Sequence, residues 1–122
     1  SGCELFMLGA AAAQGSDEDR AAFSERLLGA YEAGAPAFMV VSLMQVTGNM
    51  EAILDVADTE TDAQRFVNIV VLFDPVIAEI RRSPRFTQII DRVGLLTYWQ
   101  ETGPPDFCAD EPDAHVCQQL GR

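Results

Sequence analysis

The sequence predicts an all-α fold of stacked antiparallel helical hairpins, and three observations support this prediction. Apolar residues recur at spacings of three and four along most of the chain. Helix-capping residues precede these segments. Glycine or proline lies at the boundaries of these segments, and the connections between the segments are short. Short connections make consecutive helices antiparallel. We expect one domain over 1–103, closed by a terminal cap over 81–103, and a loosely ordered acidic tail over 104–122.

Three helices are predicted in the first part of the chain. Residues 3–13 are expected to form a helix that is small on one side and uses Leu5, Phe6 and Leu8 for packing. Ser16 caps a second helix, and Asp19 three residues later completes a variant of the capping box. Pro36 suits the first turn of a third helix over 36–47, which is apolar nearly all round and is therefore expected to be buried.

Two further helix starts are predicted after Gly48. Asn49 caps the first of them, and Thr61 with Gln64 has the pattern of another capping box. The apolar segment 64–73 is rich in β-branched residues, so a strand and a buried helix are both open there. We prefer the helix, because a single strand would have no partner.

Two pairs of a capping residue and a proline then open two short helices. Asp74-Pro75 and Ser83-Pro84 each place a side-chain acceptor before a proline at the first helical position. They predict helices over 75–82 and 84–93, and a last helix follows over about 95–102.

The charge of the chain argues against two classes of partner. There are 19 acidic and 8 basic residues, and the net charge is −11. A surface this negative repels phosphate backbones and anionic lipid, so no direct nucleic-acid binding is expected. No segment is long enough to span a bilayer, so no membrane insertion is expected either. The chain begins without a methionine or a basic leader, and we expect it to be a piece of a larger protein.

The second half of the chain resembles a known family. The segments are TGNMEAILDVAD and LFDPVIAEIRRSPRFTQIIDRVGLLTYWQETGPPDFC. They resemble the C-terminal tetratricopeptide-like (TPR-like) helical region of bacterial winged-helix transcriptional regulators and adenylate-cyclase-type signalling proteins. The matching residues are Gly48, Asn49, Ala52, Ile53, Asp74, Pro75, Arg81, Ser83, Pro84, Arg85, Phe86, Gly94, Leu95, Tyr98, Trp99, Pro105, Asp106, Phe107 and Cys108.

The resemblance covers roughly residues 47–108 and implies a TPR-like α-solenoid fragment. It implies a binding or scaffolding region whose partner is a protein or peptide, including another domain of the parent chain. It implies no catalytic centre. The expected location is the cytoplasm, with the periplasm as the alternative, because some such parent proteins carry the region outside the inner membrane.

Half of the basic residues gather within the expected cap over 81–103, and two interpretations are open. They are Arg81, Arg82, Arg85 and Arg92. Guanidinium groups can bind a phosphate or an acidic partner strip through paired hydrogen bonds. We prefer the alternative that they pair with acids close in sequence, such as Asp74, Glu79 and Asp91.

The aromatic pair Tyr98 and Trp99 also has two interpretations. The rings can stack on a ligand, or they can form an apolar lid whose polar tips reach water, and we prefer the lid. In that interpretation the stretch 83–108 covers the open end of the helix stack, with Trp99 directed inward.

The cysteines of the tail suggest no metal site. Cys108, His115 and Cys117 have a spacing that matches no established zinc module, and Cys3 is the only other thiol. A disulfide between Cys108 and Cys117 is one possibility and requires an oxidising compartment. The other is a packed Cys108 with an exposed, unreactive Cys117.

No catalytic residue and no cofactor is predicted. The single histidine, His115, lies in the tail that is expected to be loosely ordered, and there is no G-x-S-x-G elbow or glycine-rich phosphate loop. The expected function is therefore a non-catalytic protein–protein interaction or scaffolding module. Homodimerisation is one alternative. The other is a small-ligand sensor with a pocket between helices 36–47 and 62–73, lined by Phe38, Met39, Met44, Phe66 and Phe73.

Overall fold

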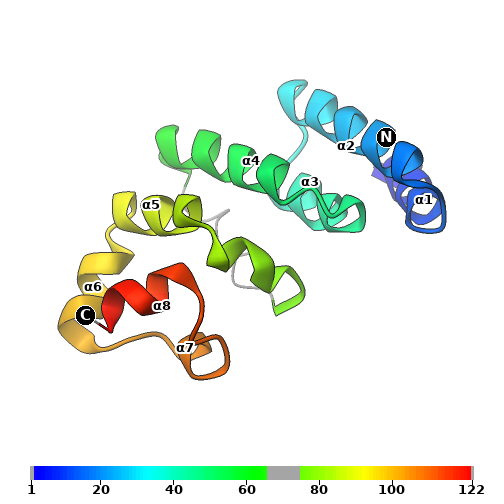
Figure 1. Ribbon diagram of the computed structural model, residues 1–122. Coiled ribbons are helices and arrows are strands. Elements are labelled where there is room, and N and C mark those ends of the chain that lie inside the picture. Colours follow the sequence, from blue (N-terminus) through cyan, green and yellow to red (C-terminus); the bar gives the residue numbers. More distant parts are fainter. Residues whose placement is uncertain (1, 66–74, 122) are drawn as a thin grey trace. The chain divides into compact units, whose positions relative to one another are not determined.

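The computed structural model describes residues 2–65 and 75–121, and all of the regular structure in these ranges is helical (Figure 1). The all-α prediction is confirmed for them. The α-helices are α1 (Gly2–Ala13), α2 (Asp17–Glu32), α3 (Ala37–Met44), α4 (Met50–Asp62), α5 (Pro84–Arg92), α6 (Leu95–Thr102), α7 (Phe107–Asp110) and α8 (His115–Leu120). The 3-10 helices are η1 (Gln45–Thr47) and η3 (Pro75–Arg82).

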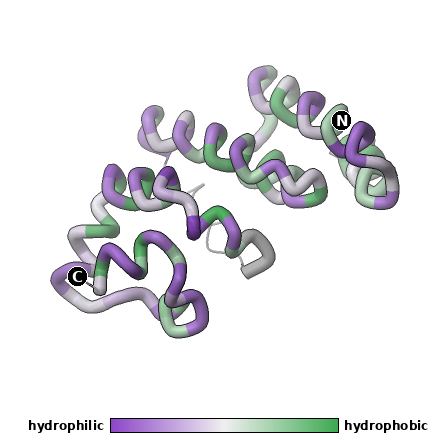
Figure 2. The backbone as a smooth tube through the Cα atoms, in the orientation of Figure 1, coloured by the Kyte–Doolittle hydropathy of each residue, from purple (hydrophilic) through white to green (hydrophobic). Residues whose placement is uncertain are grey.

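The chain divides into two compact units inside α4. Unit 1 is Ser1–Val56 and unit 2 is Ala57–Arg122. The sequence predicts a single domain ending at residue 103, whereas unit 2 takes in the residues beyond it. Hydrophobic segments recur along the helices of each unit and alternate with hydrophilic ones, as an amphipathic helix requires (Figure 2).

Unit 1 begins with α1 packed on α2. The buried residues of α1 are Leu5, Gly9 and Ala12, which lie on one side of the helix at spacings of four and three. A methyl group placed on Gly9 would lie 3.1 Å from the Phe23 ring. Glycine at this position therefore allows α1 to approach Phe23 closely.

The capping box at the start of α2 is confirmed. The Asp19 N–H donates to Ser16 Oγ at 3.2 Å, and the Ser16 N–H donates to Asp19 Oδ2 at 2.9 Å. This second bond is the main reason that the pKa of Asp19 lies below its ordinary value of 3.8. Because the folded pKa is the lower one, the stabilisation is present above pH 3.8 and is lost as the pH falls through the lowered pKa.

Asn49 caps α4 as predicted and also connects α4 to α2. Its Oδ1 accepts from the Ala52 N–H at 3.1 Å, and its Nδ2 donates to Ser24 Oγ at 3.0 Å. The buried Ser24 hydroxyl in turn donates to Met44 Sδ at 3.2 Å. These bonds satisfy polar groups that would otherwise be costly between the helices.

The third predicted helix is less buried than expected. Val40 and Met44 of α3 are fully enclosed, but Phe38 is 58% exposed. The α-helix ends at Met44, and residues 45–47, which the sequence predicts as its last turn, form the 3-10 helix η1. An all-apolar sequence does not reveal which side of a helix is covered, because its pattern has no polar face.

The predicted capping box at Thr61 and Gln64 is wrong. Thr61 lies inside α4, where its Oγ1 donates to the Ala57 carbonyl at 2.8 Å. Gln64 adopts a left-handed φ of 62°, and the Arg65 N–H donates back to the Glu60 carbonyl at 2.8 Å. These two features end a helix.

Residues 66–74 lie outside the described residues. The helix and strand alternatives for 64–73 and the cap at Asp74 therefore stay predictions, as do Phe66 and Phe73 of the suggested ligand pocket.

The start of α5 in unit 2 is confirmed. Ser83 Oγ accepts from the Arg85 N–H at 3.1 Å, and Pro84 occupies the first helical turn. The helix then buries an apolar side against the rest of the unit. Its buried residues are Phe86, Thr87, Ile89 and Ile90.

The tail differs from the loosely ordered segment that was expected. It contains α7 and α8, and Ala114 and Val116 are 0% exposed. Cys108 and Cys117 form a disulfide with a Cα–Cα distance of 5.6 Å. This bond and the ion pairs of Glu111 and Asp113 connect a mostly polar segment to itself and to unit 2.

We predict that a valine at Gly9 separates α1 from α2. Gly9→Val should lower the free energy of unfolding by about 1–3 kcal/mol, because the added atoms overlap the Phe23 ring. Gly29→Val on α2 is the matched control, since a methyl group there meets nothing within 4 Å. Its effect should be within about 0.5 kcal/mol. Urea unfolding of both variants gives the comparison, and equal losses would contradict the packing role of Gly9.

Candidate functional site

The outward side of α1 is apolar and exposed. Its members are Cys3, Phe6, Met7, Ala10 and Ala13, spaced three and four apart. We call this set the outer stripe. Phe6 is 60% exposed and Met7 is 75% exposed, and the stripe contains no charged residue. Large apolar side chains gathered on one exposed helix side are typical of an interaction surface.

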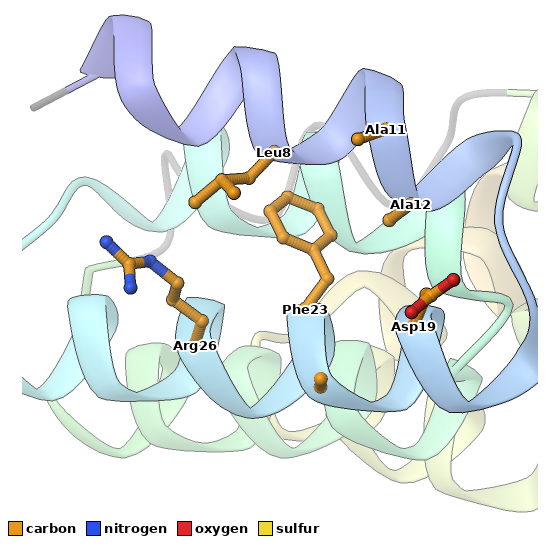
Figure 3. A pocket seen from close by; sticks show the side chains of 7 residues that line it. Leu8, Ala11, Ala12, Asp19, Phe23 and Arg26 are labelled. Carbon is orange, nitrogen blue, oxygen red and sulfur yellow. The ribbon is translucent and has the colours of Figure 1, made fainter.

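A pocket lies between α1 and α2 (Figure 3). Its volume is about 350 Å³, and its lining residues are Leu8, Ala11, Ala12, Asp19, Ala22, Phe23 and Arg26. Leu8 and Phe23 project into the space between the two helices, and Asp19 and Arg26 lie toward opposite ends of it (Figure 3). The alanine side chains of the lining are small, so the space between α1 and α2 stays open.

The positive charges of unit 1 are neutralised within the unit. Arg26 Nη2 donates to Glu4 Oε1 at 2.6 Å. Arg20 pairs with Asp17 and also donates to the Gly15 carbonyl at 2.6 Å. Residues 1–56 contain eight acidic residues and these two arginines. The surface around the pocket is therefore predominantly negative.

Arg81, one of the predicted binding residues, is buried. Its side chain is 1% exposed and makes a two-pronged ion pair with Glu111, with Nε–Oε1 at 2.7 Å and Nη2–Oε2 at 2.8 Å. Its guanidinium carbon lies 5.3 Å from the centroid of the Phe107 ring. Arg81 thus joins η3 to the tail and presents no charge to solvent.

The other three predicted arginines also form ion pairs within unit 2. Arg82 pairs with Asp113 at 3.0 Å, and Arg85 pairs with Asp58 at 2.6 Å. Arg92 pairs with Asp58 and, at 2.6 Å, with Asp62. The sequence predicts partners close along the chain, whereas these hydrogen-bonded partners lie as far as 34 positions away. Within 2–65 and 75–121, every arginine takes part in an ion pair.

The aromatic pair is split between the interior and the surface. Trp99 is half-buried and meets Phe107 edge-to-face, with ring centroids 6.1 Å apart. Tyr98 is 56% exposed. The two rings therefore differ in their surroundings, and Trp99 packs on the same phenylalanine that faces Arg81.

The disulfide encloses the part of the tail that contacts η3 and α5. Between Cys108 and Cys117 lie Glu111, which pairs with Arg81, and Asp113, which pairs with Arg82. His115 Nδ1 also lies 2.8 Å from the Thr87 hydroxyl oxygen. Of the alternatives left open by the sequence, the structure contains the disulfide, and Cys3 is the exposed free thiol.

The part of the chain that the structure describes contains no group of three or more His, Cys, Asp or Glu side chains able to hold a metal ion. In the same residues, no helix has the length and apolar content to cross a membrane. Comparisons with protein-family models, with curated proteins and with solved structures found no match to the chain.

The outer stripe and the α1–α2 pocket were not singled out by sequence reasoning. The sequence predicts packing for Leu5, Phe6 and Leu8, but only Leu5 is buried, and Phe6 and Leu8 are 60% and 37% exposed. The arginine and aromatic side chains that were singled out instead organise unit 2 internally.

We predict that loss of the Glu111 charge destabilises unit 2. Glu111→Gln removes the carboxylate charge that faces the buried Arg81 and should cost about 3–5 kcal/mol. Asp113→Asn breaks the neighbouring pair with Arg82, whose side chains are 66% and 56% exposed. It should cost less than about 1 kcal/mol. Chemical unfolding of both variants, with the disulfide intact, tests this difference, and similar small losses would show that the Arg81 pair is not a structural anchor.

Proposed function

We propose that the chain is a non-catalytic protein–protein interaction module built from TPR-like helical hairpins. The outer stripe of α1 is the observation that carries this proposal. In stacked hairpins each unit covers the apolar side of its neighbour, so an apolar stripe without charge suits coverage by another protein surface. The family resemblance supports the same role, as part of a larger signalling or transcription-regulatory protein.

The charge of unit 1 favours a partner of different sequence over a second copy. Two copies that meet at α1 would bring two acidic units together, and like charges oppose such association at low ionic strength. A partner surface that is apolar at its centre and basic around it would gain from both features. Another domain of the parent chain fits this description as well as a separate protein does.

The proposal is tested by placing charge on the outer stripe. The double variant Phe6→Glu with Met7→Glu should weaken binding to the partner about 30-fold or more, the loss typical of a central apolar anchor. Thr97→Glu with Gln100→Glu on α6 adds the same charge at exposed positions elsewhere and should leave binding unchanged.

The measurement is retention of proteins from a lysate of the source organism, followed by titration of the purified partner. Retention that is lost in the stripe variant and kept in the α6 control supports the module. Equal retention by both variants contradicts the stripe as the binding surface. A mass of two chains, measured by sedimentation and lost in the stripe variant, would assign the stripe to homodimerisation instead.

The disulfide supports the periplasmic alternative for the location of the chain. Disulfides persist in oxidising compartments and are rare in the cytosol. Alkylation of free thiols in intact source cells should therefore modify Cys3 alone, while Cys108 and Cys117 should react only after chemical reduction. Modification of all three cysteines without reduction would place the chain in a reducing compartment.

A further inference from the structure

The α1–α2 pocket is suited to accommodate one large apolar side chain. Leu8 and Phe23 project into it from opposite helices, while alanines at 11, 12 and 22 keep it open (Figure 3). Its volume of about 350 Å³ lies at the lower end of the range for small-molecule pockets. The outer stripe does not contribute to its lining, so the two surfaces can be tested separately.

The long direction of the pocket follows the helices. Asp19 and Arg26 are two turns apart on α2, which corresponds to about 10 Å along the helix axis. The groove between two packed helices accepts a third helix, whose side chains lie between theirs. Residues three or four apart on such a helix would reach the apolar centre and the Asp19 end at the same time.

The two ends of the pocket differ in charge. Asp19 follows Asp17 and Glu18 in the first turn of α2, and Arg20 pairs with Asp17, so this end keeps a net negative charge from Glu18 and Asp19. At the other end the charge of Arg26 is already paired with Glu4 at 2.6 Å. The pocket therefore favours a positive charge at the Asp19 end of an occupant and offers little attraction for a negative one.

We propose that the α1–α2 pocket binds a basic amphipathic helix of a partner protein. One large apolar side chain of this helix enters between Leu8 and Phe23, and a lysine or arginine one turn away lies beside Asp19. This inference rests on the proposed function, to which it adds a second contact surface and the chemistry of the partner.

Three labelled helical peptides of equal length test the chemistry with the full chain. One carries a leucine stripe flanked by lysines, the second carries the same stripe flanked by glutamates, and the third carries lysines around a serine stripe. Fluorescence anisotropy should show that the first binds about tenfold or more tightly than either of the others. Its affinity should fall as salt is raised, because the acidic end is exposed to solvent.

Matched variants of α2 test the place of binding. Ala22→Leu fills the pocket and should weaken binding of the lysine-flanked leucine peptide about tenfold, whereas Ala21→Leu, exposed and outside the pocket, should leave it unchanged. The outer-stripe variant Phe6→Glu with Met7→Glu should also bind this peptide normally. The proposal that the outer stripe binds a partner and the proposal that the pocket binds a helix can therefore fail independently.

Three results would overturn the inference. Equal losses in Ala22→Leu and Ala21→Leu would show that the peptide binds elsewhere. Equal affinity for lysine-flanked and glutamate-flanked peptides would remove the basis for a basic partner. Binding of an apolar dye that Ala22→Leu abolishes, with no peptide bound, would assign the pocket to a small ligand.

Discussion

The buried guanidinium of Arg81 is the constraint on which unit 2 depends. A cation that is 1% exposed is costly unless it is paired and hydrogen-bonded, and Glu111 of the tail provides a carboxylate that accepts two of its hydrogen bonds. Phe107 faces the same guanidinium and packs edge-to-face with Trp99. The disulfide then joins the two ends of the segment that contains Glu111. The ion pair with Arg81 and the disulfide thus connect the tail to the rest of unit 2.

Unit 1 is held together by different means. Side-chain caps start α2 and α4, and the contacts of the unit depend on small residues and on a short chain of hydrogen bonds from Asn49 through Ser24 to Met44. Gly9 lets α1 lie close to Phe23. Since only one side of α1 is used in this packing, the other side remains as the outer stripe, and the flank between them opens into the pocket.

The ion pairs leave the surface of the chain predominantly acidic. Each arginine in the described ranges is paired within its own unit, so the excess of acidic residues is what a partner meets. The clustered arginines near residue 85 therefore serve internal structure, and binding is proposed at apolar surfaces with acidic borders. Electrostatic attraction would then contribute mainly to the rate and selectivity of partner association.

The sequence by itself determined the helical class and the helix starts at Ser16, Asn49 and Ser83. These depend on hydrogen bonds between residues two or three positions apart, so a short window of sequence contains all the information. The spacing of Thr61 and Gln64 wrongly predicts a helix start where α4 ends, because a hydroxyl and an amide three residues apart occur at helix ends as well as at starts. Only the tertiary structure decided the order of the tail, the partners of the arginines and the two candidate binding surfaces. Those features join side chains that are distant along the chain, such as Arg81 and Glu111 at a separation of 30, and local pattern does not specify which distant groups meet.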